Sequence, residues 1–227
     1  MMNLKQMVGI EAASYIEDGM IVGLGTGSTA YYMVEELGRR IKEENLSVVG
    51  VTTSEATRQQ AEGLGIPLKS IDEVPHVDLT IDGADEVNPQ FEGIKGGGAA
   101  LLFEKIVATY SRHNIWIVDE SKWVEQLGAF PLPVEVMPYG SQQLVHLFEK
   151  EGLNPVLRVD ADNNPIVTDG KHYIIDLHCQ VIAEPRRLAD WLNSLPGVVE
   201  HGLFLSIVDT VIIGKESGIE TIQKHAN

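Results

Sequence analysis

The chain has 227 residues, of which 44% are hydrophobic, so it is long enough to bury one sizeable core and a smaller second one. It carries 17 Lys and Arg against 33 Asp and Glu, and the resulting net charge of −16 repels phosphate backbones and anionic lipid surfaces. This balance excludes nucleic acid and anionic membranes as expected partners. An anionic small molecule would need a local cluster of backbone N–H groups, hydroxyls and lysines.

Three features that the sequence lacks indicate the cellular compartment in which the protein works. Cys179 is the only cysteine, which excludes an intrachain disulfide. Residues 1–17 lack the basic, apolar and small-residue order of a signal peptide, and no apolar run approaches the ~20 residues that span a bilayer. We therefore expect a cytoplasmic protein.

The first half of the chain alternates apolar strands with amphipathic helices. The expected helices are 3–15, 30–41, 55–64 and 96–110, and the expected strands are 20–24, 48–51, 77–81 and 115–118. Parallel neighbours need a crossover, and helices are the usual one. The alternation predicts an α/β fold with a doubly wound, mainly parallel sheet and helices on both faces.

The pattern changes at Pro131, Pro133 and Pro138. Beyond them we expect helices at 141–151 and 186–195 and short strands at 156–159, 166–167, 173–177 and 198–199. Residues 131–200 are therefore predicted to form a small inserted α+β (ferredoxin-like) domain. Residues 1–130 and 201–227 would form a Rossmann-like catalytic domain, with a strand at 210–214 returning to the main sheet. Apolar surfaces on the small domain would suit a homo-oligomer, either a dimer or a tetramer.

Four polar clusters each follow a predicted strand directly. They are Thr26–Thr29, Thr52–Ser54, Asp82–Asp85 and Asp119–Lys122. Any one of them could be ordinary loop solvation. Because ligands of open α/β sheets bind outside the carboxyl ends of the strands, four such clusters at one edge favour a shared site.

The turn Gly25–Thr29 combines glycines that allow close backbone approach, hydroxyls that donate, and a following helix N-terminus. Such a turn suits a phosphate group. It does not fit the dinucleotide fingerprint, because the third glycine would fall on Ser28, and it lacks the Gly-Lys-Ser/Thr of a nucleotide P-loop. A plain tight turn with a Ser or Thr cap is the alternative.

Asp82 and Asp85 flank the small residues Gly83 and Ala84, which leave the backbone open to a ligand. Two neighbouring carboxylates could share protons, bind sugar hydroxyls or hold a metal. No histidine lies in the cluster and no H-E-x-x-H occurs, so we favour hydroxyl binding and expect no metal site. The alternative is an N-cap aspartate with an exposed neighbour.

The three consecutive glycines of Lys95-Gly96-Gly97-Gly98 cost backbone entropy on folding. This cost favours close ligand approach or an unusual backbone conformation as the reason for them. Lys95 could meet developing negative charge. On a helix beginning at Gly96, Glu104 would share a face with Gly97 and point back toward the glycines. A desolvated carboxylate there would have a raised pKa suited to proton abstraction. Alternatively, Glu104 is a solvated neighbour of Lys105.

Together these motifs resemble the ribose-5-phosphate isomerase A family, in order, spacing and total length. The likeness covers Gly23–Ala30, Thr80–Glu86, Lys95–Ala99 and Asp119–Lys122. It implies an aldose–ketose isomerase of the non-oxidative pentose phosphate pathway that interconverts D-ribose 5-phosphate and D-ribulose 5-phosphate through an enediolate. It implies no cofactor and no metal.

The resemblance also implies roles for individual residues. Glu104 falls at the family's proton-transferring base, and Asp82, Asp85 and Lys95 fall where the ring oxygen and the enediolate are handled. The implied substrate-binding residues are Lys5, Thr26, Gly27, Ser28, Thr29, Asp82, Gly83, Ala84, Asp85, Lys95, Gly96, Gly97, Gly98 and Lys122.

Two other classes of protein remain open from the sequence. A sugar-phosphate-binding regulator on this fold would keep the Gly25–Thr29 turn but would not need an acid at Glu104. A coenzyme A transferase or an amino-sugar-phosphate deaminase of related architecture would use a glutamate nucleophile or another acid–base set. Turnover of ribose 5-phosphate without additives distinguishes the three.

Overall fold

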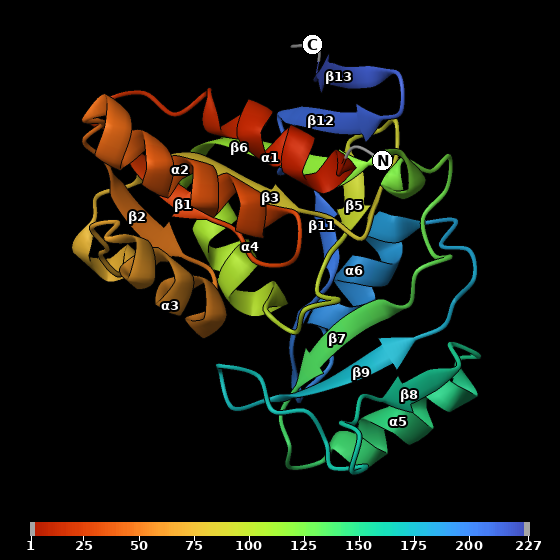
Figure 1. Ribbon diagram of the computed structural model, residues 1–227. Coiled ribbons are helices and arrows are strands. Elements are labelled where there is room, and N and C mark those ends of the chain that lie inside the picture. The colour runs from red at the N-terminus through yellow and green to blue at the C-terminus, as the bar shows by residue number, and fades with distance from the viewer. Residues whose placement is uncertain (1–2, 225–227) are drawn as a thin grey trace. The chain divides into compact units, whose positions relative to one another are not determined.

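The computed structural model describes residues 3–224 and divides into two compact units (Figure 1). The first unit contains the chain up to Ala84, residues 103–123 and the chain from Ser206 onward. The second contains residues 85–102 and 124–205. No helix among residues 3–224 is long and apolar enough to cross a membrane.

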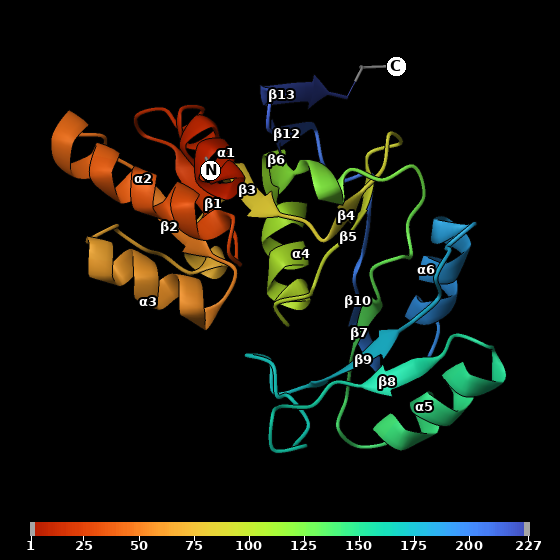
Figure 2. The ribbon, with the colours of Figure 1, turned by 45° about the vertical axis from the view of Figure 1, so that its right-hand side comes forward.

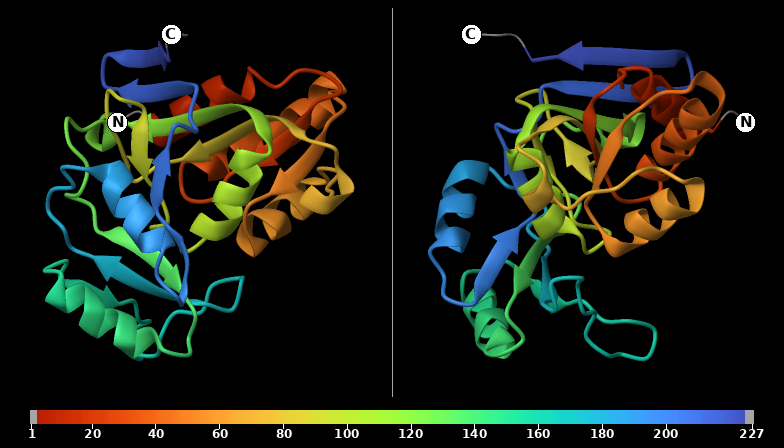
Figure 3. Two further views of the ribbon diagram at one scale, coloured as in Figure 1. Left: turned by 180° about the vertical axis from the view of Figure 1, so that it is seen from behind. Right: turned by 90° about the vertical axis from the view of Figure 1, so that its left-hand side faces the viewer.

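The first unit is built on a six-stranded sheet in the order β13-β12-β6-β3-β1-β2. Its strands are β1 (Ile21–Leu24), β2 (Val49–Thr52), β3 (Val77–Gly83), β6 (Ser111–Asp119), β12 (Thr210–Lys215) and β13 (Gly218–Gln223). All neighbours are parallel except β12 and β13, which form an antiparallel hairpin at one edge (Figure 3). The doubly wound, mainly parallel sheet expected from the sequence is confirmed.

Helices cover both faces of this sheet (Figure 2). They are α1 (Leu4–Ala13), α2 (Ala30–Glu44), α3 (Glu55–Leu64) and α4 (Leu101–Thr109), with 3-10 turns η1 (Ile71–Glu73) and η2 (Glu120–Lys122). Helices α1 and α2 bury an apolar stripe against Val22, Leu24 and Ile81, whereas Val107 of α4 packs on the opposite face with Val51. Helix α3 packs along β2 and α2.

The second unit contains two antiparallel sheets. The larger has the order β10-β7-β9-β8, formed by β7 (Leu132–Val136), β8 (Pro155–Leu157), β9 (Tyr173–Leu177) and β10 (Val198–His201). Helices α5 (Ser141–Lys150) and α6 (Pro185–Asn193) bury Phe148 and Leu192 in its core. The smaller sheet has the order β11-β5-β4, with β4 (Glu86–Val87), β5 (Glu92–Ile94) and β11 (Leu203–Leu205). The predicted 131–200 domain lies within this unit, which also includes 85–102, 124–130 and 201–205.

Three local expectations were wrong. The helix predicted from Gly96 begins only at Leu101, because Gly96 and Ala99 adopt left-handed backbone angles of φ +107° and +59°. The strand expected at 166–167 is absent and is replaced by a single bridge between Val159 and Pro165. Strand β7 was missed because Pro133 was read as a break, although an internal proline removes only one ladder donor.

Candidate functional site

The site in the first unit lies where the strand order reverses. Strand β1 has β2 on one side and β3 on the other, and ligands bind outside the carboxyl ends of strands at such a switch point. The Gly25–Thr29 turn follows β1, Thr53 and Ser54 follow β2, and Asp82 lies near the end of β3. The fourth cluster, Asp119–Lys122, follows β6, which lies beside β3 in parallel, so all four predicted clusters follow the carboxyl ends of adjacent strands.

The ends of β1 and β3 approach each other closely at Gly25 and Asp82. A Cβ atom on Gly25 would overlap the backbone and carboxylate of Asp82, so only glycine fits there. Asp82 is 2% exposed, and its Oδ1 accepts hydrogen bonds from the N–H of Thr26 at 3.0 Å and of Gly83 at 2.8 Å. These bonds fix the carboxylate against the turn.

A cluster of four hydroxyls, those of Thr26, Thr53, Ser54 and Thr57, braces the same turn. The Thr26 Oγ1 lies 2.7 Å from Thr53 Oγ1, 2.8 Å from Ser54 Oγ and 3.2 Å from Thr57 Oγ1. Thr57 also donates to the carbonyl of Gly25 at 3.0 Å. Sequence reasoning missed Thr57, although Ser54 as the N-cap of α3 places Thr57 three residues on in its first turn.

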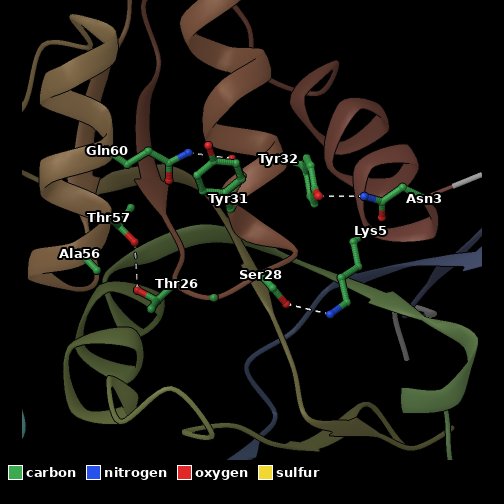
Figure 4. A pocket seen from close by; sticks show the side chains of 10 residues that line it. Asn3, Lys5, Thr26, Ser28, Tyr31, Tyr32, Ala56, Thr57 and Gln60 are labelled. Carbon is green, nitrogen blue, oxygen red and sulfur yellow. Dashed lines mark hydrogen bonds between the residues drawn. The ribbon is translucent and has the colours of Figure 1, made fainter.

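A pocket of about 580 Å³ opens beside this turn (Figure 4). It is lined by Asn3, Lys5, Thr26, Gly27, Ser28, Tyr31, Tyr32, Ala56, Thr57 and Gln60. The Nζ of Lys5 donates to Ser28 Oγ at 2.9 Å, and Gly27 has a left-handed φ of +105°. Thr29 is the N-cap residue of α2. A cation, hydroxyls and a helix N-terminus together suit a phosphate dianion.

Two further predicted residues belong to the first unit. Glu104 lies in the first turn of α4 and is 5% exposed, so the expected desolvation of this carboxylate is found. The expected reason was partly wrong, because Gly97 lies outside the helix and shares no face with Glu104. Lys122 is half-buried in η2, whose N-cap Asp119 accepts from the Ser121 N–H at 3.0 Å.

The remaining predicted residues belong to the second unit. Asp85 receives the N–H of Gly97 on Oδ2 at 2.8 Å, and its own N–H donates to the Ile94 carbonyl at 2.8 Å. Lys95 is 3% exposed, and its Nζ lies 5.4 Å from the centre of the Phe204 ring, where the cation is attracted by the ring face. The carboxylate of Asp85 and the triple-glycine loop (Gly96–Gly98) are thus brought together.

Each unit therefore gathers its own set of predicted residues. The first holds Lys5, Thr26–Thr29, Asp82, Gly83, Ala84, Glu104 and Lys122, and the second holds Asp85, Lys95 and Gly96–Gly98. Across the described part of the chain, no group of three or more His, Cys, Asp or Glu is arranged to hold a metal ion. The first unit offers a phosphate pocket and buried carboxylates, and the second offers a buried lysine beside a glycine loop. Each of these groups is of a kind that serves proton transfer on a sugar phosphate.

Known proteins resemble the chain over nearly its full length. Residues 49–218 match the family model described as ribose 5-phosphate isomerase A (phosphoriboisomerase A). The ribose-5-phosphate isomerase A of Enterococcus faecalis is 69% identical over 97% of this chain and 98% of its own, and that of Streptococcus gordonii is 59% identical over 98% and 99%.

Solved structures agree with the sequence relatives. Ribose 5-phosphate isomerase A from Methanocaldococcus jannaschii superposes with a TM-score of 0.93 at 41% identity, covering 97% of this chain and 98% of its own. A D-ribose-5-phosphate isomerase in complex with phospho-erythronic acid gives a TM-score of 0.95 at 38% identity, covering 98% and 100%.

Proposed function

The chain belongs to the ribose 5-phosphate isomerase A family and interconverts D-ribose 5-phosphate and D-ribulose 5-phosphate, and we propose that Glu104 carries the proton between C2 and C1. The observation that supports this role is a buried carboxylate in the first turn of α4, directly after the triple-glycine loop in the chain. The family membership sets aside the regulator, transferase and deaminase alternatives. The interconversion of the two pentose phosphates is a step of the non-oxidative pentose phosphate pathway.

The phosphate of the substrate is proposed to bind in the pocket beside the Gly25–Thr29 turn. Lys5 supplies a cation already hydrogen-bonded to Ser28, and the N-terminus of α2 adds oriented N–H groups. Lys122 is proposed as a second lysine that contacts the substrate. Because this pocket binds a group that does not react, it anchors the sugar and contributes binding energy that orients C1 and C2.

The carboxylates are proposed to act on the sugar in sequence. Asp82 assists opening of the furanose ring at the ring oxygen. Asp85 binds the neighbouring hydroxyls, and the small residues Gly83 and Ala84 leave the backbone open to the sugar. Glu104 then removes the C2 proton of the open aldehyde, which leaves an enediolate. Return of that proton to C1, with transfer of the O2 hydroxyl proton to O1, gives ribulose 5-phosphate without net oxidation.

Lys95 and the triple-glycine loop are proposed to stabilise the enediolate. Lys95 is buried, so its positive charge acts in a low-dielectric environment where electrostatic stabilisation is strong. The structural neighbour solved with phospho-erythronic acid binds a phosphorylated sugar acid, whose carboxylate has the planar, anionic character of an enediolate. This ligand supports a site in our chain that favours a planar anion next to a phosphate.

No metal or organic cofactor enters the proposed scheme, which consists of acid–base-assisted ring opening followed by proton transfers. We expect turnover of ribose 5-phosphate to survive exhaustive chelation unchanged. Activity lost to a chelator and restored by a divalent cation would contradict the scheme.

The decisive experiment replaces Glu104 by glutamine, which keeps size and hydrogen-bonding reach but removes the base. A positioned general base contributes roughly 10²- to 10⁴-fold, so kcat should fall by at least about 10². Calorimetry should still detect binding of ribose 5-phosphate through the phosphate pocket. Glu43→Gln, which changes an exposed carboxylate on α2, is the matched control and should retain full turnover. Near-normal kcat in Glu104→Gln would show that the proton shuttle is wrong.

We further propose that the protein works in the cytoplasm as a homo-oligomer, a dimer or a tetramer. Val156 on the edge strand β8, together with Val167 and Val181, exposes apolar surface in the second unit, which supports self-association. We also propose that residues 131–200 form a separately packed α+β domain. Light scattering coupled to size-exclusion chromatography tests the first proposal, and limited proteolysis tests the second.

A further inference from the structure

An ion pair in the second unit reaches the triple-glycine loop. Arg158 follows strand β8, and Asp176 lies on the neighbouring strand β9 (Figure 1). Their side chains are 15% and 16% exposed and form a two-pronged pair, with Nε to Oδ2 at 2.8 Å and Nη2 to Oδ1 at 2.5 Å. Such a pair fixes the plane of the guanidinium as well as its position.

The third guanidinium nitrogen of Arg158 holds the backbone of the loop. Its Nη1 donates to the carbonyl oxygen of Gly96 at 3.0 Å and to that of Gly97 at 3.1 Å. Because Asp176 already occupies Nε and Nη2, the remaining nitrogen is directed at the loop by the rigid geometry of the group. One arginine thereby orients two consecutive peptide groups.

The orientation of those carbonyls fixes the N–H groups as well. In a trans peptide the C=O and the following N–H point in opposite directions. The Gly97 N–H therefore points away from Arg158, and it donates to the Asp85 carboxylate at 2.8 Å. The peptide between Gly96 and Gly97 is thus held between a cation and an anion. By the same geometry, the Gly98 N–H is directed away from Arg158.

The loop needs such support because its backbone is unfavourable. Gly96 has φ +107° and Ala99 has φ +59°, and a non-glycine residue in this region costs of order 1 kcal/mol or more. Strained backbone conformations of this kind persist only where several contacts from the surrounding structure hold them. Arg158 and Asp85 each supply such a contact to the Gly96–Gly97 backbone.

We propose that Arg158, held by Asp176, is a positioning residue that sets the triple-glycine loop so that the Gly98 N–H and the adjacent Lys95 stabilise the enediolate. This inference rests on the proposed function, because it assumes that the loop faces the reacting oxygens. Arg158 acts through the loop and touches neither substrate nor reacting atoms in this assignment. Neither Arg158 nor Asp176 lies in one of the sequence motifs described above.

The test compares Arg158→Met and Arg158→Lys with Arg187→Met, a control arginine of the same unit whose ion pair with Glu184 is exposed. Misplacement by about 1 Å can cost about 10²-fold in rate, so both Arg158 variants should lose about 10- to 100-fold in kcat. Lysine should not rescue, because a point charge cannot bind a carboxylate and two carbonyls in a fork. Guanidinium ion, added far below denaturing concentrations, should restore part of the kcat of Arg158→Met. The affinity for inorganic phosphate should remain unchanged in all variants.

Two results for Arg158→Met would overturn the inference. One is full kcat in folded Arg158→Met. The other is a loss of kcat that accompanies equal losses of thermal stability and phosphate affinity and does not respond to guanidinium, which would indicate a role in folding alone. Lys95→Ala, measured in parallel, distinguishes failure of the inference about Arg158 from failure of the proposed function of the loop. If it keeps full turnover, the proposed role of the loop fails and the inference falls with it. If it loses about 10²- to 10³-fold while Arg158→Met does not, only the inference fails.

Discussion

Asp78 and Asp82 lie four residues apart on strand β3, at opposite ends of the same strand. Each accepts a hydrogen bond from a backbone N–H of the β1 segment, Asp78 from Ile21 at 2.9 Å and Asp82 from Thr26 at 3.0 Å. Their surroundings differ. Asp78 lies at the amino end of the parallel strands, and Asp82 lies at the carboxyl end beside a glycine-containing turn and a pocket.

The hydrogen-bond partners of the two carboxylates differ in the same way as their surroundings. Asp78 is partly exposed and is also bonded to the His76 imidazole at 2.9 Å and to the Arg112 guanidinium at 3.1 Å. Asp82 is buried, and its Oδ1 accepts the backbone N–H groups of Thr26 and Gly83. The same residue type and the same type of bond therefore serve strand alignment at one end and a site at the other. The position in the sheet decides which, since ligands approach the carboxyl ends.

The largest expected effect of removing one of these two carboxylates is on catalysis. In Asp82→Asn the amide oxygen can still accept the N–H groups of Thr26 and Gly83, but the acid–base group is removed. We expect kcat for ribose 5-phosphate to fall by about 10² or more, with a change of less than about 1 kcal/mol in the free energy of unfolding. Steady-state kinetics and urea unfolding on the same preparation measure both. Unchanged kcat would remove Asp82 from the mechanism.

The same substitution at the other end should act on stability. In Asp78→Asn the charged acceptor of the Ile21 N–H and the ion pair with Arg112 are lost, while a neutral acceptor remains. The free energy of unfolding should fall by about 1 kcal/mol, and kcat at a temperature where the protein is folded should stay within about twofold. Urea unfolding and kinetics again give both numbers. A catalytic defect larger than that of Asp82→Asn would invert the comparison between the two ends.

The smallest expected effect is a pH dependence. The backbone N–H of Ile21, helped by His76 and Arg112, holds the pKa of Asp78 below its usual value despite partial burial. A carboxyl with a depressed pKa in the folded state stabilises the fold above its unfolded pKa of about 3.9 and loses that contribution as the pH falls through the folded pKa. Below about pH 5, unfolding free energy should therefore decline more steeply in wild type than in Asp78→Asn. Parallel curves in urea titrations from neutral to acidic pH would contradict this assignment.

The residues at the carboxyl ends of the parallel strands could be predicted from the sequence, whereas those at the amino ends could not. Thr26–Thr29 and Asp82 each follow an apolar strand, and parallel strands bring such positions to one edge whatever their separation in the chain. Asp78, by contrast, is the second residue of an apolar strand, where nothing local distinguishes a strand-aligning carboxylate from a solvated one. The triple glycine indicated an unusual backbone conformation, which the left-handed φ of Gly96 confirms, whereas close ligand approach stays a prediction. The helix predicted to begin at Gly96 was wrong, because this conformation delays the helix to Leu101.

The residues that brace the site were missed for a related reason. Thr57 bonds to the carbonyl of Gly25 and the hydroxyl of Thr26, 32 and 31 residues earlier, and Arg158 bonds to glycines 61 and 62 residues earlier. Such partners are chosen by tertiary packing, and no periodic pattern or turn signature marks Arg158. Sequence reasoning found the groups proposed to meet the substrate, and the structure adds those that hold them in place.

The return of β12 to the main sheet has a consequence for synthesis of the chain. Strand β12 pairs in parallel with β6, and Asp209 accepts the N–H of Asn114, 95 residues earlier. During translation the open edge of β6 therefore waits until the whole of 124–205 and the strand itself have left the ribosome. Pairings over such separations form late and slowly, and unpaired strand edges attract other chains. A nascent chain stalled before Thr210 presents that edge unprotected, so chaperone dependence and aggregation of this protein should be governed by its last strands rather than by its first domain-forming segment.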